Sequence, residues 1–209
     1  MAIESASSDP SLALASSDGE AFAQDGWAGE GRQASELLPR LLVLLARAGR
    51  DLREATALAV GVGPGSFTGL RVSMSLAKGM ALALRVPLVG VPSLVAWLEA
   101  EPRAAAAISR AGAQDTYLLR RSDQEPRIVA ASDLPATVGD APLAAPSELA
   151  STFGLVGTLP PHEAAAGVAR LAARRLSQDP HGDDLARLEP WYLRPPRGVP
   201  SPEAVIGWP

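Results

Sequence analysis

The sequence predicts an α/β protein built from two lobes, the first better defined than the second. Near the N-terminus, short apolar runs alternate with glycine and aspartate turns, which is typical of antiparallel strands. An apolar run, a glycine-rich loop, a long helical pattern and another apolar run follow, which indicates a right-handed crossover between parallel strands. Strand-like runs and an alanine-rich helix recur in the second half, so a second α/β lobe is expected there.

The elements of the first lobe follow from local signals along the chain. Asp18 and Gly19 mark the turn of a hairpin. Ser35 is suited to cap the first long helix and Gly49 to end it, while Ser93 is suited to cap a short last helix. The expected elements, in order, are strands 2–5, 11–15 and 21–24, helix 35–48, strand 57–62, helix 67–84, strand 86–91 and helix 93–97.

The second lobe shows a weaker pattern, with many proline residues between the apolar runs. We expect the first lobe to span residues 1–98, the second 99–194, and a mobile Pro-rich tail 195–209. The expected elements of the second lobe are strands 104–108, 116–119 and 128–130, a loop 134–146, a buried strand 153–157, helix 162–177 and a strand-like run 188–193.

Composition limits the classes of function that the chain can have. It has 209 residues, of which 47% are hydrophobic, which is enough apolar surface for a core. Its formal charge of -4 argues against binding nucleic acid by bulk electrostatics. The absence of cysteine excludes disulfides, thiolate metal sites and cysteine nucleophiles. No apolar run approaches the ~20 residues of a membrane helix, so a soluble cytoplasmic protein is expected.

The segment 61–71, GVGPGSFTGLR, joins an expected strand to an expected helix and suggests a phosphate-binding loop. It lacks the Lys and Ser or Thr that a Walker A loop places after its last glycine, and its glycine spacing fails the dinucleotide fingerprint. Two interpretations stay open: glycines that serve only a tight turn and close helix packing, or a weak anion site. The residues of that anion site are Gly63, Gly65, Ser66, Thr68 and Arg71.

Other catalytic arrangements have weaker support in the sequence. His162 and His181 lie far apart, and neither has a second ligand at helical spacing, so no metal residues are predicted. Ser66 lacks the Gly-x-Ser-x-Gly spacing of a nucleophile elbow. Glu4, after the first strand, is a water-mediated magnesium ligand, a solvated carboxylate or a turn former. We therefore predict no catalytic residues.

Two helices carry more apolar surface than one sheet needs. Helix 67–84 has two apolar stripes on opposite sides. One contains Leu70, Met74, Ala77, Ala81 and Leu84, and the other contains Val72, Leu76, Gly79 and Ala83. Helix 35–48 has a wide apolar arc of leucines. The excess predicts either a partner interface or packing of the helices on each other and on the second lobe. The residues predicted for the interface are Leu37, Leu41, Leu44, Leu45, Leu70, Met74, Ala77 and Ala81.

Six stretches of the chain resemble one known family. The longest match runs from GVGPGSFTGLR through LAKGMALAL (76–84) to VPLVGVPSL (86–94). Shorter matches are AIES (2–5), ELLP (36–39) and LEPWYLR (188–194), whereas residues 104–160 match only loosely. These motifs resemble the TsaB (YeaZ) family, the dimerisation subunits of the bacterial machinery that makes N6-threonylcarbamoyladenosine in transfer RNA.

The resemblance implies an actin-like, sugar-kinase-like (ASKHA) fold with two related lobes of mixed sheets flanked by helices. It implies a non-catalytic subunit that pairs through its two N-lobe helices with a larger paralogue, TsaD. In this family TsaD carries the metal and transfers the threonylcarbamoyl group, and the ATPase TsaE docks on the pair. The resemblance thus implies no cofactor of this chain's own, with ATP and metal in the partners, and contact with tRNA only through the complex. A homodimer of the chain alone stays open.

The chain departs from the family pattern at its N-terminus. Glu4 stands where the family has an aspartate, Gln33 and Ala34 replace a usual histidine, and the first strand is short. The longer carboxylate would displace any phosphate or magnesium contact at that point. Two other functions stay open: a small actin-like ATPase or phosphotransferase that uses the glycine loop, and a glycoprotease-like hydrolase.

Overall fold

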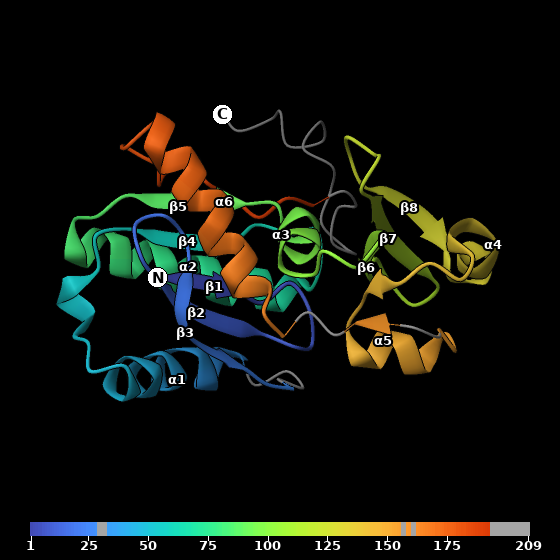
Figure 1. Ribbon diagram of the computed structural model, residues 1–209, viewed down its shortest axis with the longest axis horizontal. Helices are drawn as coiled ribbons and strands as arrows, with labels where there is room; N and C mark the ends of the chain where they lie inside the picture. The colour runs from blue at the N-terminus through green and yellow to red at the C-terminus, as the bar shows by residue number, and fades with distance from the viewer. Residues whose placement is uncertain (29–32, 156–157, 160–161, 193–209) are drawn as a thin grey trace, which may run out of the picture.

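The computed structural model has two five-stranded sheets, each flanked by helices, arranged as two lobes side by side (Figure 1). It describes residues 1–28, 33–155, 158–159 and 162–192. None of the helices within these ranges is both long and apolar enough to cross a membrane. The expected α/β class with two lobes of mixed sheets is confirmed.

The first sheet has the strand order β3-β2-β1-β4-β5. Its β1, β2 and β3 form an antiparallel meander, whereas β1, β4 and β5 run parallel, as the hairpin and crossover signals predicted. The elements of this lobe are β1 (Ala2–Glu4), β2 (Ser11–Ala15), β3 (Ala21–Gly26), α1 (Gln33–Arg47), a 3₁₀ turn (Leu52–Glu54), β4 (Leu58–Gly61), α2 (Phe67–Leu84), β5 (Leu88–Val91) and α3 (Ser93–Ala100).

Helices cover both faces of the first sheet, and the alternation of side chains along its strands determines which helices pack where. Ile3 and Leu58 belong to the apolar cluster with the inner faces of α1 and α2. Their neighbours Ala2 and Ala59 point to the other face, where they pack with α3 and α6 (Ala164–Gln178). Large side chains thus meet α1 and α2, and small ones let α3 and α6 approach closely.

The second sheet has the order β10-β9-β6-β7-β8, with an antiparallel meander β6-β7-β8 and parallel pairs at β9. A smaller apolar cluster lies between this sheet and its short helices. The elements are β6 (Ala106–Arg110), β7 (Asp115–Arg120), β8 (Arg127–Ala130), a 3₁₀ turn (Ala131–Asp133), α4 (Leu134–Val138), β9 (Leu143–Ala144), α5 (Ser147–Thr152) and β10 (Thr158–Leu159).

One helix lies with a different sheet from the one expected. The expected boundary at residue 98 falls within α3 (Ser93–Ala100). Helix α6, expected within the lobe 99–194, packs on α3 and the first sheet. A Cβ atom on Gly167 of α6 would lie 2.0 Å from the Ala96 carbonyl oxygen, so the contact with α3 is very close. The sequence shows an apolar alanine face but does not show which sheet that face will meet.

Some local predictions were wrong. The expected loop 134–146 contains α4 and β9, Phe153 and Gly154 form a turn, and 188–192 form no strand, although Trp191 N–H donates to Val62 O. Helix α1 begins two residues before Ser35, and Pro92, not Ser93, is the N-cap of α3. The mistakes fall where prolines and short elements weaken the periodic signal. The predicted tail 195–209 lies outside the described residues.

Candidate functional site

The glycine loop between β4 and α2 uses its own N–H donors within the chain. Gly63 adopts a φ of 100° and donates its N–H to the Ser93 hydroxyl at 2.9 Å. Ser66 donates its N–H to Ala6 O at 2.6 Å, and Gly69 N–H donates to the Ser66 hydroxyl at 3.2 Å, which caps α2. A phosphate-binding loop needs such groups free. An anion site at the predicted residues stays a prediction, and these N–H groups do not support it.

Gly65 and Gly69 of the loop pack against the connection between β1 and β2. A Cβ atom on Gly65 would lie 2.2 Å from Ala6 O, and one on Gly69 would lie 2.1 Å from Ser5 O. The Ser5 hydroxyl also donates to Gly69 O at 2.8 Å. Glycine is therefore required here for close approach of the helix to the sheet, which is the structural interpretation left open by the sequence.

Replacing Gly69 by alanine is expected to lower the free energy of unfolding by about 1–3 kcal/mol, because the backbone of Ser5 would have to move. Urea unfolding of the isolated chain measures this change. Gly79→Ala on the same helix is the matched control, since a Cβ there meets nothing within 4 Å. An equal stability of Gly69→Ala and wild type would contradict the close packing.

Glu4 lies at the end of β1 and is buried, with 1% of its surface exposed. Its Oε1 accepts a hydrogen bond from Ala6 N–H at 2.6 Å, while Oε2 has no hydrogen-bond partner among the described residues. A Cβ atom on Gly61 would lie 1.9 Å from Oε2, so this carboxylate requires a glycine beside it. Burial raises the pKa of Glu4 to about 7, and the bond from Ala6 opposes that rise. The carboxyl thus lies in the core and not at the surface, where a solvated side chain was one expectation.

The side chains considered for metal and nucleophilic chemistry do not come together. His162 and His181 are both exposed, and the Ser66 hydroxyl is engaged as the cap of α2. Within the described ranges, no group of three or more His, Asp or Glu side chains is placed to hold a metal ion.

The eight residues predicted for a partner interface are buried in the chain's own core. Their exposed fractions run from 0% to 5%. Seven of them pack in the apolar cluster between the first sheet and helices α1 and α2, and Leu70 belongs to the cluster that contains α3 and α6. Apart from Leu37, which lines a groove described below, they offer a partner almost no surface in this structure, so the choice of these residues needs correction. The residues are Leu37, Leu41, Leu44, Leu45, Leu70, Met74, Ala77 and Ala81.

The opposite faces of the same two helices carry the exposed apolar surface. On α1, Leu38, Leu42 and Val43 are 40%, 47% and 49% exposed. On α2, Val72 and Leu76 of the second stripe are half-buried, and Gly79 and Ala83 are exposed. A groove of about 430 Å³, here called the α1–α2 groove, lies between the helices and is lined by Ala34, Leu37, Leu38, Arg71, Val72, Ser75 and Leu76.

An aromatic and arginine cluster lies where α2 begins. The Arg71 guanidinium carbon is 4.1 Å from the centre of the Phe67 ring, and Arg71 Nε donates to Tyr192 Oη at 3.2 Å. The Phe67 and Tyr192 rings are 5.3 Å apart. Since Arg71 also lines the α1–α2 groove, this cluster supplies a positive group at one end of an apolar surface.

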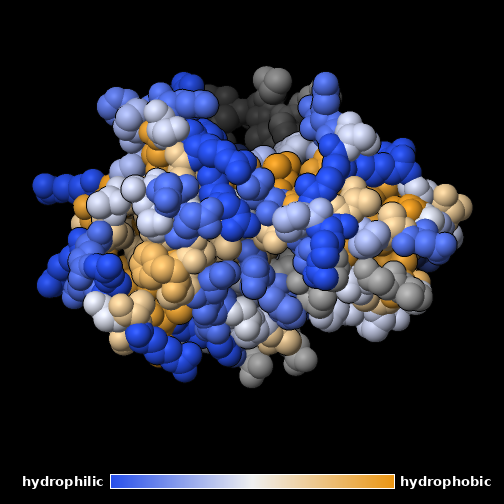
Figure 2. Space-filling view, in the orientation of Figure 1, coloured by the Kyte–Doolittle hydropathy of each residue, from blue (hydrophilic) through white to orange (hydrophobic). Residues whose placement is uncertain are grey.

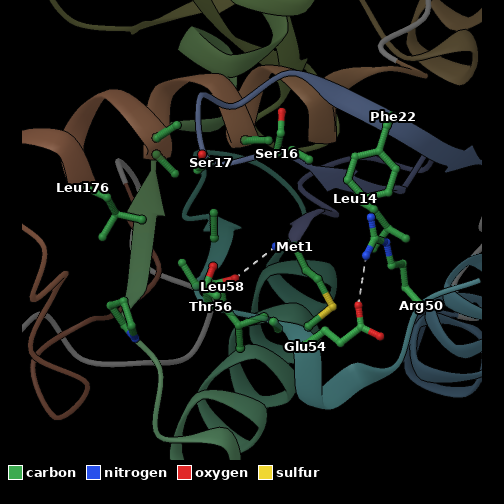
Figure 3. Close-up of a pocket in the computed structure, with 18 of the residues that line it drawn as sticks. Met1, Leu14, Ser16, Ser17, Phe22, Arg50, Glu54, Thr56, Leu58 and Leu176 are labelled. Atoms are coloured by element: carbon green, nitrogen blue, oxygen red, sulfur yellow. Dashed lines mark hydrogen bonds and ion pairs between the residues drawn. The ribbon is translucent and has the colours of Figure 1, made fainter. Parts of the chain in front are cut away.

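A second cavity, of about 580 Å³, is lined by residues at the amino ends of β4 and β5, whereas the glycine loop follows the carboxyl end of β4. Figure 3 shows this cavity. Leu14, Leu58 and Leu176 are among the residues that line this cavity. On the surface, apolar side chains gather on the left of Figure 2, below α6. Arg50 and Glu54 form an ion pair of 3.2 Å among the lining residues. The sequence alone did not reveal this cavity, because distant segments build its wall.

The fold has known counterparts. YeaZ from Pseudomonas aeruginosa matches with a TM-score of 0.68 and 23% identity, over 91% of this chain and 97% of that one. Another P. aeruginosa structure, described as an uncharacterized protein with similarity to peptidase YEAZ, matches with a TM-score of 0.69 and 24% identity, over 92% and 97%. Two mixed sheets flanked by helices, together with these matches, define an actin-like two-lobe α/β protein.

Sequence comparisons then give the family. The model described as TsaD, tRNA N6-adenosine threonylcarbamoyltransferase, matches residues 31–133. The tRNA threonylcarbamoyladenosine biosynthesis protein TsaB of Escherichia coli is 42% identical over 59 residues, 28% of this chain and 26% of that protein. A protein of Mycobacterium tuberculosis, described as uncharacterized, is 33% identical over 171 residues, 80% of this chain and 77% of its own. The chain belongs to the TsaB (YeaZ) family, although its alignment with the E. coli protein spans about a quarter of that protein.

Proposed function

We propose that the chain is a non-catalytic subunit that pairs with a TsaD-type paralogue in the biosynthesis of threonylcarbamoyladenosine in tRNA. The observation that carries the proposal is the exposed apolar surface of α1 and α2, with Leu38, Leu42 and Val43 each at least 40% exposed beside the α1–α2 groove. Large adjoining apolar side chains on a surface favour a protein partner. The E. coli relative is named for this biosynthesis, and the TsaD model covers both helices.

The chemistry of the chain favours an accessory role. In the glycine loop, the N–H groups of Gly63, Ser66 and Gly69 donate hydrogen bonds to acceptors of the chain itself and are not free for a phosphate. The carboxyl of Glu4 lies in the core beside Gly61. In the proposed complex, ATP and the metal ion belong to the partners, TsaE docks on the pair, and tRNA is contacted only through the assembly in the cytoplasm.

Reconstitution of the tRNA modification tests this proposal. Incorporation of radiolabelled threonine into tRNA is measured in an extract of the same organism depleted of this chain, with TsaD and TsaE present, before and after the purified chain is added back. We expect incorporation only when the chain is present. Unchanged incorporation in its absence would overturn the proposal, and tight ATP binding with turnover by the isolated chain, seen by calorimetry, would favour the phosphotransferase instead.

Replacing Gly79 by alanine is expected to stabilise the isolated chain and to weaken the pair. The stabilisation should be about 0.5–1 kcal/mol, because an exposed glycine inside a helix is unfavourable and the added Cβ meets nothing within 4 Å. In the pair, the same methyl group would hold the partner's backbone away from α2. Thermal unfolding and co-purification with TsaD measure the two effects, and tighter pairing by Gly79→Ala would count against an interface at this face.

A further inference from the structure

Resting on the proposed function, we infer that Arg71 is a preset recognition residue of the α1–α2 groove and that it selects a partner helix carrying a carboxylate beside its apolar face. The inference begins with the lining of the groove. Leu37, Leu38, Val72 and Leu76 are apolar, and among the described lining residues Arg71 alone carries a charge. The groove therefore combines an apolar floor with one cationic end.

The guanidinium of Arg71 is already oriented before a partner arrives. Its face lies 4.1 Å from the Phe67 ring centre, and its Nε donates to Tyr192 Oη at 3.2 Å. Because these contacts already restrict the Arg71 side chain, less side-chain entropy is lost when a partner binds. Within the part of the chain that the structure describes, neither terminal amino group of Arg71 has a partner. Two parallel N–H donors in a fixed plane match the two oxygens of a carboxylate.

The start of α2 adds to the positive potential at this end of the groove. No acidic residue lies in the first turn of α2, so the positive end of the helix dipole is not neutralised there. The N-cap is the uncharged Ser66. A carboxylate is thus favoured at this end both by the guanidinium and by the helix.

The charges of the two helices argue that the carboxylate comes from a different protein. Helix α2 contains no aspartate or glutamate, and the single acid of α1, Glu36, is paired with Arg40 at 3.8 Å. In a dimer of this chain through these helices, Arg71, Lys78 and Arg47 of one copy would approach the same three residues of the other copy, so like charges would face each other. The α1–α2 groove therefore favours a hetero-partner over self-association.

The test compares the affinity of the full chain for TsaD over a series of salt concentrations, by calorimetry. Arg71→Gln is expected to weaken binding about ten-fold or more at low salt and to flatten its salt dependence, while Arg71→Lys keeps the salt dependence but recovers only part of the affinity. Leu76→Ala should weaken binding with the salt dependence intact. Arg53→Gln, at an exposed arginine in the 3₁₀ turn before β4, is the matched control and should bind as wild type.

The outcomes separate this inference from the proposed function. If wild type binds TsaD and Arg71→Gln binds equally with the same salt dependence, the inference is wrong and the proposed function stands. If wild type does not bind TsaD, both are wrong. Light scattering of the chain alone completes the test, because a homodimer as tight as the heterodimer and equally sensitive to Arg71→Gln would overturn the selection of a hetero-partner.

Discussion

Replacing Leu76 by glutamate is expected to abolish association with TsaD while the isolated chain stays folded. Leu76 lies half-buried along the α1–α2 groove, where a glutamate can still reach water in the free chain. In the pair, that carboxylate would be buried against apolar side chains without a partner, which costs several kcal/mol. Leu38→Glu, at a side chain that is 40% exposed, should act in the same way. Co-purification and thermal unfolding of each variant measure the two properties.

Two variants make this experiment specific. Ile128→Glu changes an apolar side chain of similar exposure, 39%, on β8 of the second lobe, and should pair as wild type. Met74→Glu places the charge at a residue that is 4% exposed, in the core beneath α2, and should unfold the chain by a loss of about 3 kcal/mol or more. Normal pairing by both Leu76→Glu and Leu38→Glu would show that the interface lies elsewhere.

Glu4→Gln is expected to make the chain more stable than wild type at neutral pH, by an amount that depends on pH. Burial raises the pKa of Glu4 from an ordinary value of 4.5 to about 7. Because the folded state binds the proton more tightly than the unfolded state, wild type has its full stability below pH 4.5 and loses it as pH rises toward 7. That loss is on the order of 3 kcal/mol. Glutamine carries no titratable proton and can still accept the hydrogen bond from Ala6.

The measurement is the free energy of unfolding of both proteins from pH 4 to pH 9. The difference between them should rise through the range from pH 4.5 to 7 and stay level above it. A difference between Glu4→Gln and wild type that is the same at every pH would mean that Glu4 titrates normally in the folded chain.

The periodicity of the sequence was sufficient to predict most elements of the first lobe. Helix α2 was placed at residues 67–84, where the structure has it, because its glycine loop and apolar repeat are strong signals. In the second lobe, β9 and β10 have two residues each, too few to show alternation. Their existence depends on pairing with strands distant in the sequence, which no local pattern records.

The residues predicted for a partner interface lie on faces of α1 and α2 that the structure buries. The repeat along α2 distinguishes Met74 from Leu76 as members of opposite stripes, yet both stripes are apolar. Only the packing on the first sheet decides that Met74 points inward, at 4% exposed, and that Leu76 borders the groove. The sequence also did not reveal the cluster of Phe67, Arg71 and Tyr192, because Tyr192 lies 121 positions from Arg71.

By itself the sequence determined the α/β class, the two lobes, the glycine turn before α2 and the membership of the TsaB family, since these depend on local periodicity and on contiguous motifs. The tertiary structure alone decided which faces of α1 and α2 remain exposed, that α6 covers the first sheet, and that Glu4 is buried beside Gly61. Burial and contact between distant segments are properties of the packed chain. A helix carries its apolar stripes wherever it lies, but only its neighbours determine which stripe stays available to a partner.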